Sequence, residues 1–206
     1  MLSVEDITEP SEDLLVDETF VHPDTKKSIT HKVMNIEKVV GRIVDTMVAR
    51  EKEGKNFGVI TLAEGLAEYL PAEHTVGVKR DEHGHLSIAD VNFGKLFAKA
   101  IAKAYKARTG NDRKVTGVTL GYESRCAIPT AFDVLLGSAL GVGAFRALYE
   151  KGLDEVMVST VGQLELRFVP FDELIERDTM KTKTRYITFG SDFHKLARFL
   201  ETYVHV

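Results

Sequence analysis

The spacing of apolar residues predicts several helices. Apolar side chains recur at helical spacing in three long stretches, residues 36–53, 90–108 and 130–151. Asn35 precedes the first stretch and Asp90 opens the second, and both residue types cap helices well. Thr130 with Asp133 has the form of a capping box, with Asp in place of the usual Glu. Two short helices are also predicted, over residues 170–175 and 192–204, the second with Ser191 as its cap.

Four apolar runs between these helices have the length of strands. Residues 57–62 form a continuous, largely apolar run, which is typical of a strand that is covered on both faces, and residues 115–121 are the second candidate for such a strand. Residues 155–160 and 163–169 follow the third helix, and a hairpin turn is expected at 161–163. Strands that alternate with long helices predict an α/β protein with a mainly parallel sheet in a three-layer α/β/α, Rossmann-like arrangement.

The first 35 residues differ from the rest of the chain. Up to Thr30 they carry eight acidic residues against two lysines. We therefore expect an acidic N-terminal segment over 1–35 that is partly disordered or adds an edge strand at 14–21, and an α/β domain over 36–206.

Composition and charge narrow the classes of function. The formal net charge of −4 argues against a general nucleic-acid binder. A lone cysteine, Cys126, cannot form an internal disulfide, which favours a cytoplasmic location. No uninterrupted apolar run approaches the ~18 residues of a membrane span, so no membrane partner is expected.

Candidate binding residues follow the two buried strands, because ligands of such sheets lie beyond the carboxyl ends of the strands. Glu64 follows residues 57–62, where it either binds a ligand or forms a salt bridge at the sheet edge. The run Gly121, Tyr122, Glu123, Ser124 and Arg125 follows the second strand. Its arginine fork suits a phosphate, while the alternative is a loop whose arginine pairs with a local acid.

Other candidate binding residues have weaker support from the sequence. Arg113 and Lys114 precede the second strand and could meet an anion, or could belong to a solvated loop. His83 and His85 are spaced like a metal pair, but no further ligands accompany them, so no metal site is expected. The sequence contains no Walker A loop, no Gly-x-Gly-x-x-Gly and no Gly-x-Ser-x-Gly.

Two motifs resemble those of phosphofructokinases, most closely the pyrophosphate-dependent kind. That family carries Gly-Tyr-Glu-Gly-Arg, then a small residue or two, then Pro-x-x-Phe-Asp. Here the run reads Gly121 to Arg125 with Ser124 in place of a glycine, then Pro129, Phe132 and Asp133. Upstream, residues 54–71 are similar to the family's Gly-Lys-Asn-Tyr-Gly-Val strand that ends in Glu-Gly-Leu.

The resemblance implies a role for each candidate residue. Glu64 takes the place of the acid that binds the hydroxyls of fructose 6-phosphate, and Tyr122 and Arg125 take the places that hold the sugar and its 6-phosphate. Glu123 and Ser124 lie within the same motif. Arg113 or Lys114 falls near a basic residue that reaches the 6-phosphate of a neighbouring subunit, which implies a homo-oligomer.

Three motifs of the family are absent. The Gly-Gly-Asp-Asp loop that binds the phosphoryl donor, the Thr-Ile-Asp that holds the catalytic base and the Met-Gly-Arg motif that grips the sugar do not occur in this sequence. The resemblance therefore implies the sugar-phosphate half of a glycolytic kinase, inactive without a donor half that binds pyrophosphate with Mg²⁺. Two alternatives remain open: a non-catalytic sensor of sugar phosphates, and ATP as the donor.

Overall fold

The computed structural model describes residues 2–9, 13–21, 28–78, 91–121, 126–176, 181–183, 185–199 and 201. By its internal contacts the chain forms two compact units, Met1–Thr119 with Tyr186–Val206, and Leu120–Arg185. The expected boundary at residue 35, between an acidic N-terminal segment and an α/β domain, stays a prediction.

The first unit begins with a short helix and a hairpin. Helix α1 (Val4–Thr8) is followed by β1 (Leu15–Val21) and β2 (Ser28–Met34), which pair antiparallel with Leu15 opposite Met34 and Val21 opposite Ser28. The strand over residues 14–21, one of the two readings of that segment, is present. Leu14 and Met34 are buried in the core at the base of this hairpin.

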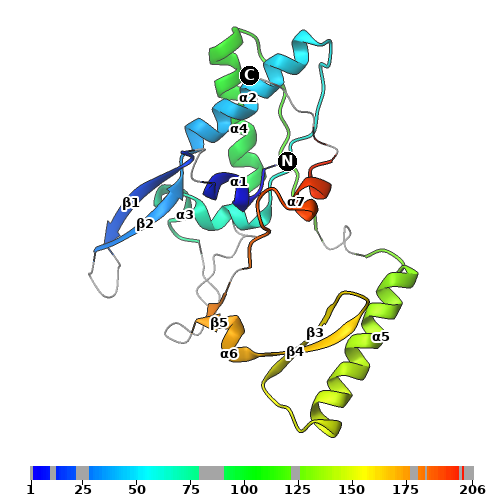
Figure 1. The fold of residues 1–206 in the computed structure, drawn as a ribbon. Coiled ribbons are helices and arrows are strands. Elements are labelled where there is room, and N and C mark those ends of the chain that lie inside the picture. The colour runs from blue at the N-terminus through cyan, green and yellow to red at the C-terminus, as the bar shows by residue number, and fades with distance from the viewer. Residues whose placement is uncertain are drawn as a thin grey trace. The chain divides into compact units, whose positions relative to one another are not determined.

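Two long helices carry the core of the first unit (Figure 1). Helices α2 (Ile36–Lys52) and α4 (Phe93–Thr109) pack against each other, and their apolar faces meet α1 and the 3₁₀ helix η2 (Glu64–Tyr69) in one buried cluster. The unit also contains α3 (Ala72–Thr75) and α7 (Asp192–Ala197).

The helix ends follow their caps. The Asn35 side chain accepts a hydrogen bond from the backbone N–H of Lys38, as expected for the cap of α2. Helix α4 was expected to start at Asp90, and this expectation is wrong. The helix starts at Phe93, and the Asn92 side chain caps it by accepting from the N–H of Lys95. Asp90 itself lies outside the described residues. Ser191 caps α7 as expected, although the helix is shorter than the predicted 192–204.

The second unit is a helix against a hairpin. The helix comprises α5 (Ala131–Phe145) and a π-helical turn, η5 (Arg146–Glu150), and the hairpin comprises β3 (Val156–Val161) and β4 (Glu165–Pro170). A Cβ on Gly143 would come within 2.5 Å of Val158, so this glycine allows the close approach of helix and hairpin. The unit ends with α6 (Phe171–Leu174) and the two-residue strands β5 (Ile175–Glu176) and β6 (Lys181–Thr182).

Helix α5 begins as the sequence predicts. Thr130 and Asp133 form the capping box, with the Asp133 carboxylate accepting from the Thr130 hydroxyl and N–H at 2.7 Å. These two bonds hold the pKa of Asp133 below its ordinary value. The whole stretch Ala131–Glu150 is long and apolar enough to cross a membrane by length and composition alone, with a mean hydropathy of 1.5. Reading for an uninterrupted run misses it because Asp133 and Arg146 interrupt the apolar residues.

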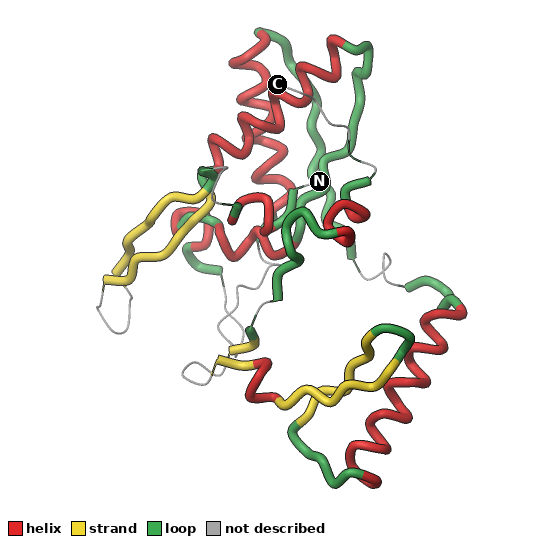
Figure 2. Tube along the Cα trace, in the orientation of Figure 1, coloured by secondary structure: helices red, strands yellow, loops and turns green. Residues whose placement is uncertain are grey.

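The predicted fold class is confirmed only as a mixture of helices and strands. All the paired strands among the described residues are antiparallel and two-stranded, and a parallel sheet is not seen there. Residues 55–61 and 112–120 run beside α2 and α4 and are drawn as loop in Figure 2. Both segments are apolar enough for strands of a sheet, but a strand also needs a neighbouring strand to which its backbone is hydrogen-bonded. Among the described residues, the parallel pairing seen here is the isolated bridge between Leu2 and Leu62.

Candidate functional site

Glu64 is exposed at the point where the first apolar segment ends. Just before it, the N–H of Leu2 donates to the carbonyl of Thr61 at 2.8 Å, and the N–H of Ala63 donates to the carbonyl of Leu2 at 2.9 Å. After it, the next residues of η2 turn inward, and Leu66 is fully buried. Glu64 is therefore held at the surface, and its carboxylate does not bear the cost of burial that its position after an apolar run suggests.

The C-terminal segment braces the elements beneath Glu64. The hydroxyls of Tyr69, on η2, and Tyr186 lie 3.0 Å apart, and the N–H of Ile187 donates to the carboxylate of Glu5 at 2.9 Å. Burial and the bond to Tyr186 raise the pKa of the Tyr69 hydroxyl. Burial alone would raise the pKa of Glu5, but the hydrogen bond from Ile187 and its other partners lower it.

An ion pair completes this brace. The Arg198 guanidinium donates to Asp6 at 2.5 Å, and the Asp6 side chain is nearly buried. The other oxygen of Asp6 accepts from the N–H and hydroxyl of Ser3. The start and end of the chain are thereby joined in the first unit, which fixes the platform that presents Glu64.

Arg113 is not presented to solvent as a free anion-binding group. Its guanidinium forms an ion pair with Glu51 of α2 and lies over the ring of Tyr105, 5.5 Å from the centroid. The buried Tyr105 hydroxyl donates to both carboxylate oxygens of Glu51, at 2.8 and 2.7 Å. The Tyr105 hydroxyl and the Glu51 carboxylate raise the pKa of the Arg113 guanidinium.

The same arginine fixes the start of both apolar segments. It also donates to the carbonyl of Asn56 at 3.3 Å, so it joins the beginnings of residues 55–61 and 113–119. Sequence reasoning noted Arg113 but missed Glu51 and Tyr105, because nothing local marks partners that are 62 and 8 residues away. Lys114, the next residue, is exposed.

We expect Tyr105→Phe to lower the free energy of unfolding by about 1–2 kcal/mol, because it removes a donor to a partly buried carboxylate. Urea unfolding followed by circular dichroism measures this change. Tyr149→Phe is the matched control: the Tyr149 side chain is 80% exposed, and we expect its loss of a hydroxyl to change stability by less than about 0.5 kcal/mol. Equal effects of the two substitutions would contradict a stabilising role for the cluster.

The remaining predicted site residues lie elsewhere. Tyr122, Glu123, Ser124 and Arg125 fall outside the described residues, as do His83 and His85. Gly121, the first residue of the run, belongs to the second unit, whereas Glu64, Arg113 and Lys114 belong to the first. Among the predicted residues that the structure describes, the local surroundings are therefore known for three, and the convergence of the two strand ends stays a prediction.

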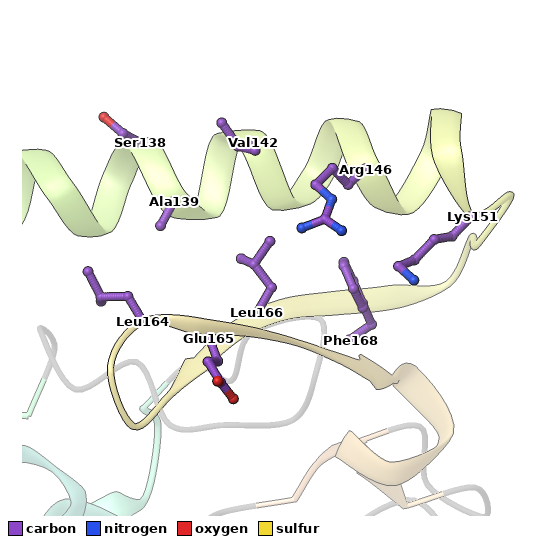
Figure 3. Close-up of a pocket in the computed structure, with 9 residues that line it drawn as sticks. All are labelled: Ser138, Ala139, Val142, Arg146, Lys151, Leu164, Glu165, Leu166 and Phe168. Carbon is purple, nitrogen blue, oxygen red and sulfur yellow. The ribbon is translucent and has the colours of Figure 1, made fainter.

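A groove of about 780 Å³ lies between α5 and the hairpin of the second unit (Figure 3). Its walls are Ser138, Ala139, Val142, Arg146, Lys151, Leu164, Glu165, Leu166 and Phe168. Arg146 points into it but already donates to Glu150 at 2.9 Å, and the Lys151 ammonium lies 5.8 Å from the centre of the Phe168 ring. Of the predicted binding residues that the structure describes, Glu64, Arg113 and Lys114 do not line this groove.

Among the residues that the structure describes, no group of three His, Cys, Asp or Glu side chains is placed to hold a metal ion.

Comparison with known proteins shows the class of protein to which the chain belongs. No model of a protein family matches the chain. It is 30% identical over 187 residues to the pyrophosphate–fructose 6-phosphate 1-phosphotransferase of Thermotoga maritima, a match that takes in 87% of this chain and 43% of the relative. The corresponding enzyme of Naegleria fowleri is 35% identical over 149 residues, which are 70% of this chain and 33% of that protein.

An ATP-using relative is found as well. The ATP-dependent 6-phosphofructokinase of Corynebacterium efficiens is 30% identical over 157 residues, with 75% of this chain and 42% of the relative covered. The chain belongs to the phosphofructokinase family, as a distant homologue of both its pyrophosphate-dependent and its ATP-dependent members, and the resemblance of its motifs is confirmed. It spans less than half the length of these curated relatives.

Proposed function

We propose that this chain is the fructose 6-phosphate-binding half of a pyrophosphate-dependent 6-phosphofructokinase. The observation that carries the proposal is the exposed Glu64 at the carboxyl end of an apolar extended segment, in a chain homologous to enzymes named for this reaction. An exposed carboxylate on a fixed platform can accept hydrogen bonds from sugar hydroxyls.

The other roles follow the motif. Arg125 offers a planar fork of donors to the 6-phosphate, Tyr122 holds the sugar, and Glu123 and Ser124 accept hydrogen bonds from its hydroxyls. Of the two basic candidates before the second segment, the structure favours Lys114, because it is exposed while Arg113 is paired with Glu51. Lys114 would reach the 6-phosphate held by a neighbouring copy, which makes a homo-oligomer part of the proposal.

The chemical step needs groups that this sequence does not contain. The sugar 1-hydroxyl must lose its proton to a base and attack one phosphorus of pyrophosphate. The bond from that phosphorus to the bridging oxygen then breaks and inorganic phosphate leaves, while the negative charge of these groups must be neutralised. The proposal assigns that base, and the site for pyrophosphate with Mg²⁺, to a donor half. This chain supplies binding and orientation of the sugar phosphate, in a glycolytic, cytoplasmic setting. The Gly-Tyr-Glu-Ser-Arg run favours pyrophosphate over ATP by analogy alone.

Calorimetry tests the binding role directly. We expect the chain to bind fructose 6-phosphate with a dissociation constant in the range typical of enzyme substrates, ~1 μM to 1 mM. Fructose without the phosphate should bind far more weakly, because the charge-assisted bonds are lost. Equal heats for fructose and fructose 6-phosphate, or none for either, would contradict the proposal.

A sensor without turnover is the second candidate, and the missing donor-side motifs favour it. An assay with pyrophosphate and Mg²⁺ separates the two functions once binding is shown. Fructose 1,6-bisphosphate formed only when a donor half is added supports the kinase half. Binding that never leads to product, even with a donor half present, supports the sensor.

A further inference from the structure

The backbone on both sides of Glu64 rests on residues at the start of α1. The N–H of Ala63 donates to the carbonyl of Leu2, two residues before α1, at 2.9 Å. A Cβ on Gly65 would lie 3.0 Å from a methyl group of Val4, the first residue of α1, so Val4 fills the space in front of Gly65. Because Glu64 lies between these two contacts, its position depends on the position of α1.

Helix α1 in turn depends on Asp6. The helix has five residues, whereas isolated helices shorter than about 12 residues are marginal in water. The Asp6 side chain is only 7% exposed. One of its oxygens accepts from the N–H and the hydroxyl of Ser3, and the other accepts from Arg198 of the C-terminal segment. The N–H of Ile187, in the same segment, donates to Glu5, so α1 is tied to that segment at two successive residues.

Arg198 is presented to Asp6 by the end of α7. It is the C-terminal cap residue of this helix, and its Nε donates to Glu201 at 2.5 Å while its Nη1 donates to Asp6. His194 of α7 is 8% exposed, and among the described residues its buried Nε2 has no hydrogen-bond partner. Burying such a group costs free energy, so the attachment of α7 to α1 relies on the ion pair between Arg198 and Asp6.

We propose that Asp6 is a positioning residue for Glu64 and that the C-terminal segment controls the sugar site through it. This inference rests on the proposed function, in which Glu64 binds the sugar hydroxyls. Asp6 itself does not contact the sugar. It fixes α1 against Arg198, and α1 fixes the backbone on both sides of Glu64 through Leu2 and Val4. Because a binding group must be held to within about 0.5 Å, a small shift of α1 weakens the site.

Asp6→Asn is the test variant, because it keeps the size of the side chain and removes the charge that holds Arg198. We expect its dissociation constant for fructose 6-phosphate, measured by calorimetry well below the thermal midpoint, to rise on the order of tenfold. Asp45→Asn is the matched control. Asp45 also pairs with an arginine, Arg108, but that pair joins α2 to α4, so its loss should leave the dissociation constant unchanged.

A double-mutant cycle shows whether Asp6 acts through Glu64. In the Glu64→Ala background, Asp6→Asn should weaken sugar binding little further, because the carboxylate that Asp6 positions is already gone. An equal loss of affinity in both backgrounds indicates a general effect on the fold and contradicts the positioning role.

Hydrogen exchange at the Ala63 amide measures the same coupling without sugar. This amide donates to Leu2, so loosening α1 should speed its exchange on the order of 10-fold in Asp6→Asn, while the amides of α5 in the other unit keep their rates. Should Asp6→Asn fail to fold, Arg198→Lys takes its place. It keeps the charge but loses the fork that joins Asp6 to Glu201, and both effects should be smaller.

Two results would overturn the proposal: unchanged exchange at Ala63, and faster exchange that leaves the dissociation constant for fructose 6-phosphate unchanged. If the unsubstituted chain binds no fructose 6-phosphate, the proposed function fails by itself. Faster exchange at Ala63 then still supports the control of this backbone by Asp6, and unchanged exchange refutes that control as well.

Discussion

Gly117→Ala is expected to destabilise the first unit by about 3 kcal/mol, at the upper end of what overpacking costs. A Cβ at this position would lie 2.3 Å from the carbonyl carbon and oxygen of Gly94 and 2.7 Å from the nitrogen of Lys95. These are backbone atoms of α4, which cannot swing aside as a side chain can. The segment 113–119 would have to move off the helix, and urea unfolding monitored by circular dichroism measures the loss.

A substitution of Gly94, the residue that Gly117 contacts, is the matched control. In Gly94→Ala the new Cβ would lie 3.4 Å from Gly117, and the gain in helix propensity of up to ~1 kcal/mol offsets the tight fit. Gly41→Ala, in α2, meets nothing within 4 Å and should stabilise the protein slightly. If Gly117→Ala unfolds no more easily than Gly94→Ala, the close approach of segment and helix is not a real feature of the fold.

Local chemistry made the helix ends predictable. Asn35, Ser191 and the Thr130–Asp133 pair each cap the helix that follows them, because a cap depends on atoms within three residues of one another. The start of α4 was misplaced because Asp90 and Asn92 are both good caps two residues apart. Only the structure shows that Asn92 makes the bond.

Strand pairing was predicted less well, for a physical reason. An apolar run of strand length indicates that a segment is extended and covered by other parts of the protein. It does not indicate which segment lies beside it in the sheet. The β1–β2 and β3–β4 hairpins are close in sequence and form antiparallel pairs. The parallel sheet expected of residues 57–62 and 115–121 needs neighbours from far away, and the chain spans 43% of the Thermotoga maritima relative.

The candidate site divides in the same way. Glu64 and Lys114 were found from their places at the ends of apolar runs, and both are exposed. That Arg113 is held by Glu51 and Tyr105 depends on the packing of α2 against α4, which no local pattern encodes. Arg113 is thus engaged in joining the two segments while Lys114 is exposed, and a role of either residue in phosphate binding stays a prediction.

Helix α5 carries a large exposed apolar surface. Along Ala131–Glu150 only 11% of the apolar window is buried, and Phe132, Leu135 and Phe145 are among its exposed side chains. A helix that is apolar on all sides belongs in an interior, where each face meets protein. Within a phosphofructokinase longer than this chain, such a helix has the composition of a covered core element.

Arg125→Ala is expected to weaken fructose 6-phosphate binding by about 2–4 kcal/mol, a factor of roughly 30 to 1,000 in the dissociation constant. The proposed role of Arg125 is a charge-assisted, two-pronged bond to the 6-phosphate, and alanine removes both donors and the charge. The dissociation constant of Arg125→Lys should fall between those of the unsubstituted protein and Arg125→Ala, since lysine keeps the charge but loses the planar fork. Titration calorimetry of the three proteins gives the order directly.

Arg167→Ala is the matched control for this series. Arg167 is an exposed arginine of β4 in the same unit, and it belongs to no motif of the family resemblance. Its loss changes the net charge by the same amount as Arg125→Ala, so any effect of long-range charge alone should appear equally in both. An unchanged dissociation constant in Arg125→Ala, or an equal loss in Arg167→Ala, would remove Arg125 from the phosphate site and leave the sugar-binding role of the Gly121–Arg125 run without its main contact.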